Sequence, residues 1–121
     1  MLDDAYFMNE AIKEAHKAFD KAEVPIGAVV VYQNKIIARA HNLTETLNDV
    51  TAHAEMQAIT AAANAMGGKY LNECTLYVTI EPCPMCASAC YWAQMVRLSM
   101  GQAMKKWVPN RKNSPYSILK L

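Results

Sequence analysis

Two short segments carry one imidazole, two thiols and one carboxylate in a spacing typical of a zinc site. The first segment is His53-Ala54-Glu55, and the second contains Cys83 and Cys86 as a Cys-x-x-Cys pair. Zinc binds nitrogen and sulfur ligands tetrahedrally, and a catalytic zinc keeps three protein ligands and a water molecule. The imidazole and the two thiols supply three ligands, which leaves Glu55 free to accept a proton from that water. The pattern therefore predicts hydrolysis at a zinc centre.

Two other interpretations of the Cys-x-x-Cys pair are weighed against this one. The pair could be a redox pair of the thioredoxin type, or part of a structural zinc site whose fourth ligand is Cys74 or Cys90. Neither interpretation needs a carboxylate two positions from a histidine, so Glu55 favours the catalytic site. Cys74 and Cys90 are then expected to be small buried apolar residues, as free cysteines commonly are.

Length and composition predict one domain with a single hydrophobic core. The chain has 121 residues, of which 53% are hydrophobic. Its uncharged stretches are shorter than the roughly 18 to 20 apolar residues that a membrane span needs. The acidic start, Met1 to Tyr6, does not resemble a signal peptide. We therefore expect a soluble cytoplasmic protein without membrane contact, in which the cysteines stay reduced.

The opening elements are a helix and a hairpin. Apolar residues recur every three or four positions from Asp4 to about Ala22, which predicts an amphipathic helix with an inner stripe of Ala5, Met8, Ile12, Ala15 and Phe19. Residues 26–32 and 35–40 are rich in apolar and β-branched residues and flank Gln33-Asn34, which predicts a β-hairpin. The apolar run in its first strand indicates cover on both faces.

The elements that follow bring the site residues to two helix starts. A helix over residues 52–66, ended by Gly67-Gly68, places His53 and Glu55 in its first turn. A strand over residues 76–80 precedes a second helix that begins near Pro84, between the two cysteines of the pair. Residues 96–100 form a fourth strand. The order predicts an α/β fold with a mixed sheet covered by helices. If the N-termini of the two helices meet, their dipoles would favour the thiolate forms of Cys83 and Cys86.

These residues match a known family. His53-x-Glu55 with Pro82-Cys83-x-x-Cys86 resembles the signature of the zinc-dependent cytidine and deoxycytidylate deaminase superfamily, from about Asp4 to Gly101. Within that superfamily, the chain looks most like bacterial tRNA-specific adenosine deaminases, and the segments that carry this resemblance are residues 23–29, 40–42, 51–55 and 76–83. Those enzymes convert adenosine to inosine at the wobble position of an anticodon. The resemblance implies a three-layer α/β/α sandwich, one Zn²⁺ per chain, a tRNA anticodon arm as partner, and a homodimer.

The resemblance also implies a role for each site residue. The zinc ligands would be His53, Cys83 and Cys86, and Glu55 would shuttle protons between water, the ring nitrogen and departing ammonia. Asn42 would hydrogen-bond the base, with the backbone of Ala54 at the pocket floor. From the residues alone, Asn42 is a loop or turn residue.

The same resemblance places the helix that begins near Pro84 at the dimer interface. The residues concerned are Met85, Ser88, Ala89 and Trp92. From helical spacing alone, these side chains could equally fill the core of a monomer.

After residue 100 the chain departs from that family. We divide it into a deaminase domain, residues 1–100, and a basic atypical tail, residues 101–121, in which no regular element is expected. The tail has Met104 where the family has an acidic residue, and we expect no counterpart of the C-terminal helix that the family usually carries. Its basic residues could contact phosphate or simply be solvated; they are Lys105, Lys106, Arg111, Lys112 and Lys120.

Two alternative functions remain open. One is a deaminase of a small molecule such as guanine, cytosine or a nucleoside, because Cys90-Tyr91-Trp92-Ala93 slightly resembles guanine deaminases. The other is a non-catalytic zinc module whose altered C-terminus leaves only folding or partner binding. Val24-Pro25-Ile26-Gly27 favours the tRNA branch over the first alternative, and Glu55 argues against the second.

Overall fold

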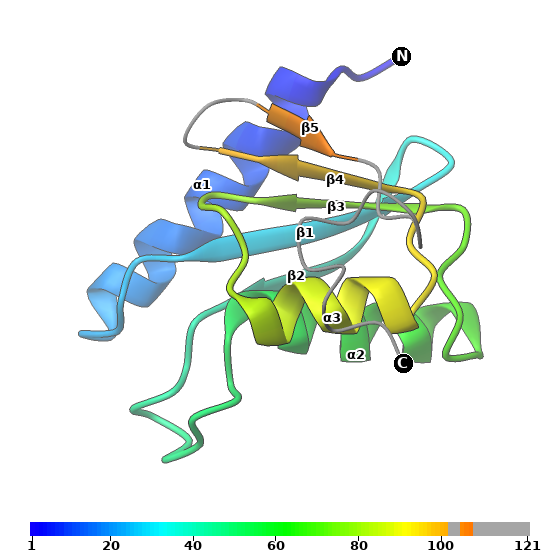
Figure 1. The fold of residues 1–121 in the computed structure, drawn as a ribbon. Coiled ribbons are helices and arrows are strands. Elements are labelled where there is room, and N and C mark those ends of the chain that lie inside the picture. Colours follow the sequence, from blue (N-terminus) through cyan, green and yellow to red (C-terminus); the bar gives the residue numbers. More distant parts are fainter. Residues whose placement is uncertain (102–104, 108–121) are drawn as a thin grey trace.

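A mixed β-sheet forms the middle layer of the protein (Figure 1). The structure is a computed structural model, and it describes residues 1–101 and 105–107. The sheet has the strand order β2-β1-β3-β4-β5, with bounds β1 Gly27–Tyr32, β2 Lys35–His41, β3 Cys74–Val78, β4 Arg97–Met100 and β5 Lys105–Trp107. β3 and β4 run parallel, and the other neighbouring pairs are antiparallel. The predicted mixed sheet is thus confirmed.

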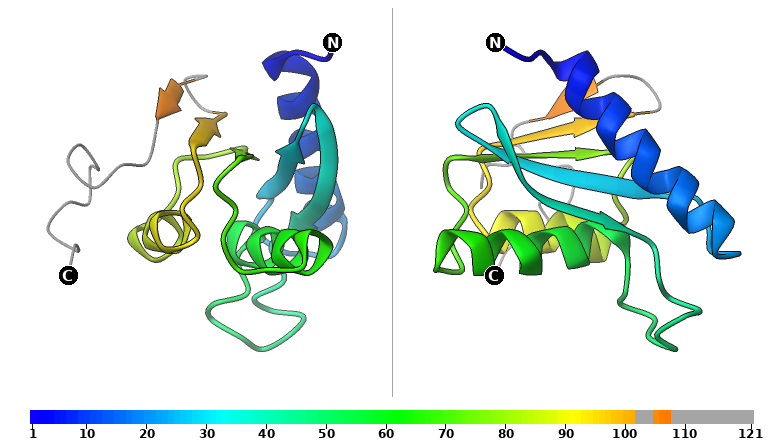
Figure 2. Two further views of the ribbon diagram at one scale, coloured as in Figure 1. Left: turned by 90° about the vertical axis from the view of Figure 1, so that its right-hand side faces the viewer. Right: turned by 180° about the vertical axis from the view of Figure 1, so that it is seen from behind.

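Helices cover both faces of the sheet. α1, Asp4–Asp20, lies on one face, and α2, Ala54–Met66, lies beside α3, Pro84–Trp92, on the other (Figure 2). Side chains of β1 point alternately into the two layers: Val29 packs with Phe7 of α1, and Val30 packs with the core beneath α2. The predicted three-layer α/β/α sandwich is confirmed, as is the cover on both faces of β1.

The turns that end these elements follow from their residues. Gln33 and Asn34 have φ angles of 50° and 62°, the pair of positive values that a tight type I′ hairpin turn requires. Gly67 ends α2 with a φ of 76°, in the left-handed region that favours glycine. The hairpin and the end of α2 therefore lie where the sequence predicts them. The third strand begins and ends two residues earlier than expected, at Cys74 and Val78.

The predicted stripe of α1 is partly wrong. The helix ends at Asp20 instead of Ala22, and Ile12 and Phe19 are exposed, as is Ala5. The inner face consists instead of two large and three small apolar residues, Phe7, Met8, Ala11, Ala15 and Ala18. The cause is the close approach of β1 to α1.

Gly27 makes that approach possible. A Cβ atom at this position would lie 2.1 Å from the Ala11 carbonyl oxygen and 2.4 Å from the Ala15 backbone nitrogen. Because the strand lies this close to the helix, the small Ala11 and Ala15 face it at Gly27, and Ile12 and Phe19 of the expected stripe face outward.

The expectation of an irregular tail is also wrong in one place. β5 pairs antiparallel with β4, with Lys105 opposite Met100 and Trp107 opposite Leu98. The rest of the predicted basic tail, apart from Gly101 and β5, lies outside the described residues, and this includes Met104, Arg111, Lys112 and Lys120. In the described part of the chain, no helix has the length and apolar character needed to cross a membrane.

Candidate metal and catalytic site

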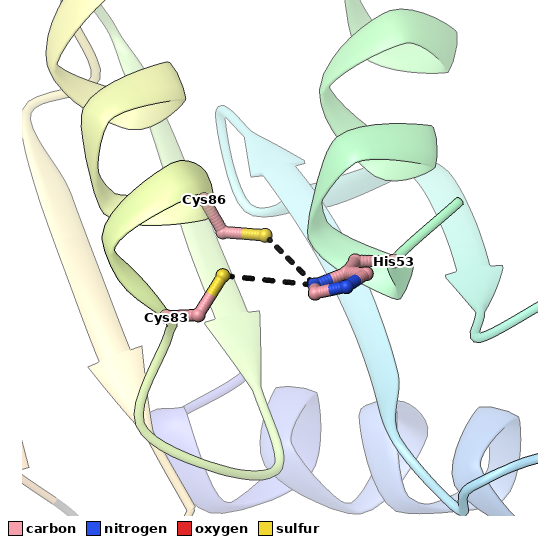
Figure 3. Close-up of side chains that lie close together, drawn as sticks. All are labelled: His53, Cys83 and Cys86. Carbon is pink, nitrogen blue, oxygen red and sulfur yellow. Dashed lines mark hydrogen bonds between the residues drawn. The ribbon is translucent and has the colours of Figure 1, made fainter. Parts of the chain in front are cut away.

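The predicted ligands meet where two helices begin. His53 is the N-cap residue of α2 and Cys83 is the N-cap residue of α3, both with extended backbone. Neither side chain caps its own helix through a hydrogen bond, so each can point away from it. Figure 3 shows both sulfur atoms of the Cys-x-x-Cys pair directed at the imidazole of His53. The prediction that the helix starts bring these residues together is confirmed.

The distances among the three side chains fit a tetrahedral zinc site. The Nδ1 atom of His53 lies 3.6 Å from Cys83 Sγ and 3.5 Å from Cys86 Sγ. All three candidate ligand atoms lie within 4.8 Å of one another. Zinc–nitrogen and zinc–sulfur bonds of usual length at a tetrahedral angle separate nitrogen from sulfur by about 3.6 Å. The donor set and its spacing therefore fit zinc without rearrangement.

Burial makes the site unfavourable for thiolates in the absence of a cation. Cys86 is fully buried. Its burial, followed by the nearby negative charge of Glu55, raises the pKa of the Cys86 thiol well above its usual range. That the two helix N-termini favour the thiolates stays a prediction. A metal cation reverses such a shift because it stabilises the thiolate directly.

Glu55 has the environment of a proton carrier. The residue lies in the first turn of α2 and is 2% exposed. Its Oε1 is the one buried side-chain oxygen or nitrogen in the described part of the chain that lacks a hydrogen-bond partner. Leaving such an atom unpaired costs about 1 to 3 kcal/mol, and a catalytic role or a bound ion is among the explanations for such a group. The Oε1 atom of Glu55 is thus left available to take part in proton transfer near the group of His53, Cys83 and Cys86.

Asn42 and Ala54 lie next to the elements that form this group. Asn42 follows directly after β2 and is 4% exposed, and Ala54 is the first residue of α2 and fully buried. The Asn42 amide makes two long hydrogen bonds, donating to the Val24 carbonyl at 3.4 Å and accepting from the Thr44 N–H at 3.3 Å. Such long bonds are weak. Contact of Asn42 with a base stays a prediction.

The structural-zinc alternative finds no fourth ligand here. Cys74 and Cys90 are fully buried, as expected, and all four cysteines are free thiols. Neither residue belongs to the group of His53, Cys83 and Cys86 within the described ranges. Burial, followed by the charge of Glu55, raises the pKa of Cys90 to about 12.

The exposed side of α3 bears on the predicted interface. Met85, Ser88 and Ala89 are half-buried, and Trp92 is 54% exposed. Within the residues that the structure describes, these side chains therefore do not fill the core of the monomer.

Sequence reasoning missed two residues that hold the loop between β2 and α2. Gln57 donates to the carbonyls of His41 and Ala52 at 2.8 and 3.1 Å, which closes the base of the loop. It follows His53 by four positions, and this helical spacing could have indicated it. Glu23 binds the loop from another segment, and no local pattern in the sequence indicates this.

Comparisons with known proteins identify the family. The model of the family described as "Cytidine and deoxycytidylate deaminase zinc-binding region" matches residues 1–102. The tRNA-specific adenosine deaminase of Bacillus subtilis (strain 168) is 54% identical over 84% of this chain and 63% of its own length. That of Streptococcus pyogenes serotype M18 is 44% identical over 97% of this chain and 72% of its own length.

Two solved structures are similar. One comes from a study of A-to-I editing by tRNA:A34 deaminases at the wobble position of transfer RNA. Its sequence is 49% identical to this chain, and the TM-score is 0.78. The match covers 79% of this chain and 74% of the solved chain. The other, guanine deaminase from B. subtilis, is 38% identical with a TM-score of 0.79, covering 82% and 64%. The chain spans 63% of the length of the B. subtilis tRNA-specific adenosine deaminase, which is less than two thirds. With its metal group and α/β/α fold, this chain belongs to the cytidine and deoxycytidylate deaminase family.

Proposed function

We propose that the protein is a zinc-dependent deaminase that converts adenosine to inosine at the wobble position of a tRNA anticodon. The observation that carries the proposal is the juxtaposition of the group of His53, Cys83 and Cys86 with buried Glu55, which interacts with Cys86 and whose Oε1 lacks a hydrogen-bond partner among the described residues. The substrate follows from the relatives, since those with 44% to 54% identity act on tRNA adenosine. The reaction consumes water and releases ammonia.

His53, Cys83 and Cys86 are the residues proposed to hold one zinc ion per chain. When bound, zinc is a Lewis acid that makes water nucleophilic near neutral pH. The two thiolates offset its charge, so the site is close to neutral. The helix starts that carry these ligands keep them in place before the substrate arrives.

Glu55 is proposed to move the protons of the reaction. Its carboxylate would accept one from the attacking water and donate it to the ring nitrogen of the base. It would then transfer the second proton of that water to the departing amine, which leaves as ammonia. A buried carboxylate suits this role because its Oε1 has no hydrogen-bond partner among the described residues.

Substrate binding is proposed to use Asn42 and the backbone of Ala54. Each polar atom of the Asn42 side chain makes one hydrogen bond, to Val24 or Thr44, which leaves a second N–H donor and a second oxygen lone pair for the edge of a base. Ala54 has no side chain that would obstruct a ring between His53 and Glu55.

The proposed setting is a cytoplasmic homodimer that binds the anticodon arm. Four free cysteines suit a reducing compartment. The exposed ring of Trp92 leaves α3 accessible to a second copy of the chain, which the family resemblance places there. Within this proposal, residues 1–100 form the catalytic domain and the basic tail after them contributes to RNA binding.

Deamination of a free base is the second candidate, because guanine deaminase from B. subtilis has a similar fold. Ammonia release by the zinc-loaded protein should be measured with an anticodon stem–loop, free guanine and cytidine. We expect release from the stem–loop at a rate well above that from either small molecule. Faster release from guanine would instead support the second candidate, and zinc binding without any release would support a non-catalytic module.

A further inference from the structure

Glu23 is a buried carboxylate whose charge is stabilised by hydrogen bonds from a loop. It lies between α1 and β1 and is 4% exposed. It accepts hydrogen bonds from the Thr46 N–H and hydroxyl, both at 2.7 Å, and from the Glu45 N–H at 3.1 Å. A buried carboxylate is costly unless such charge-assisted bonds satisfy it. These three bonds therefore fix the turn at residues 44–46.

The same segment also holds the start of the loop. The Asn42 N–H donates to the Ile26 carbonyl at 3.1 Å, and the Asn42 side chain donates to the Val24 carbonyl at 3.4 Å. Residues 23–26 thus contact the loop at its first residue and again at its turn. This loop, residues 42–53, projects beyond the helices in both views of Figure 2.

The turn and the Asn42 amide are directly connected. The Thr44 N–H donates to Asn42 Oδ1 at 3.3 Å, and Thr44 is adjacent to Glu45, one of the two residues that Glu23 holds. If the turn moved, this donor would move with it and the Asn42 side chain could rotate. The orientation of the amide therefore depends on a carboxylate in another segment.

We propose that Glu23 is a positioning residue that fixes the Asn42 amide toward the target base and so determines how well the site distinguishes that base. The inference rests on the proposed function, in which Asn42 binds the base. Burial opposes the charge of Glu23, but the hydrogen bonds from the loop outweigh it and keep its pKa below the usual range. The carboxylate thus stays charged, with every acceptor site available to the loop, at neutral pH.

Glu23→Gln tests this role because it keeps the size of the side chain but turns amide hydrogens toward the loop donors. In a Glu55→Ala background, binding should be measured for an anticodon stem–loop and for the same stem–loop with an abasic target position. The ratio of the two affinities isolates recognition of the base. Amide exchange at Glu45 and Thr46 reports on the turn itself.

We expect Glu23→Gln to reduce the preference for adenosine over the abasic site by about tenfold and to accelerate exchange at Glu45 and Thr46. Zinc content and affinity for the abasic stem–loop should stay unchanged. The matched control is Glu10→Gln, which alters a buried carboxylate bound to Lys13 and Arg39 and should keep the full preference. An unchanged preference in Glu23→Gln would overturn the proposal.

Thr46→Val provides a second test should Glu23→Gln fold poorly, because it removes only the hydroxyl donor. It should lower the preference less than Glu23→Gln does, and a full preference with Thr46→Val would then count against the inference. If the Glu55→Ala protein itself showed no preference for adenosine, the proposed function and this inference would both fall. A preference that survives both loop variants would overturn the inference alone.

Discussion

The Sγ atom of Cys86 lies 3.5 Å from Nδ1 of His53, although 33 positions separate the two residues in the chain. One residue comes from the first turn of α3 and the other from the N-cap of α2. The contact thus joins the two helices of one layer at their N-terminal ends. The stability of this end of the molecule is therefore expected to depend on the metal.

The first prediction concerns the ligands. Cys86→Ser should remove most of the bound zinc, because serine is a poor replacement for a thiolate. Cys90→Ser is the matched control: it is equally buried on α3 but stands outside the ligand group. We expect Cys90→Ser to keep about one zinc per chain, measured by elemental analysis of purified protein. Equal zinc content in the two variants would contradict the assignment of the ligands.

The second prediction concerns the contact between α1 and β1. Gly27→Ala should lower the free energy of unfolding by about 3 kcal/mol, because its Cβ atom would meet backbone of α1 at 2.1 Å. Gly68→Ala should change this free energy by less than about 0.5 kcal/mol, since nothing lies within 4 Å of its Cβ position. Urea unfolding of both variants provides the comparison. Similar losses in both would show that the packing of α1 on β1 is looser than described.

These packing details show where sequence reasoning reached its limit. Apolar spacing predicts that α1 is amphipathic, but it cannot tell that Ala11 and Ala18 face the sheet while Ile12 and Phe19 do not. That choice depends on the close approach at Gly27, which is a tertiary property. β5 has three residues, too few for any periodic pattern to reveal.

The metal group could be predicted because its signals are local. Pro84 indicates a helix start, and an alanine-rich run after His53 indicates another. The fold then needs only to bring these starts together. The hydrogen bonds of Glu23 could not be predicted in this way, because their partners lie 22 and 23 positions away in a loop.

The third prediction concerns pH. The folded pKa of Glu23 is below its ordinary value of 4.5, because its hydrogen bonds outweigh the effect of burial. Its stabilising contribution is therefore complete above 4.5 and is lost as the pH falls through the lower folded value. Urea unfolding from pH 7 down to acid should show a smaller loss of stability for Glu23→Gln than for the unchanged protein. Parallel pH profiles for the two proteins would contradict this sign.

The fourth prediction concerns Asn42. Asn42→Ala should reduce kcat/KM for the stem–loop by about tenfold to a hundredfold, because a hydrogen bond to the base is lost. Asn72→Ala is the control, since Asn72 is an exposed asparagine before β3 whose φ is not positive. Steady-state kinetics of the two variants with equal zinc content should separate them. A full kcat/KM in Asn42→Ala would remove this residue from the site.

The central claim is tested most directly by inosine formation. The zinc-loaded protein and its Glu55→Ala variant should be incubated with an anticodon stem–loop that has adenosine at the wobble position, and the nucleosides should then be analysed. We predict inosine at that position with the unchanged protein. The variant, with the same zinc content, should be slower by about 10² to 10⁴ or more. Zinc-loaded protein that forms no inosine, or a Glu55→Ala variant that forms it at the full rate, would contradict the account.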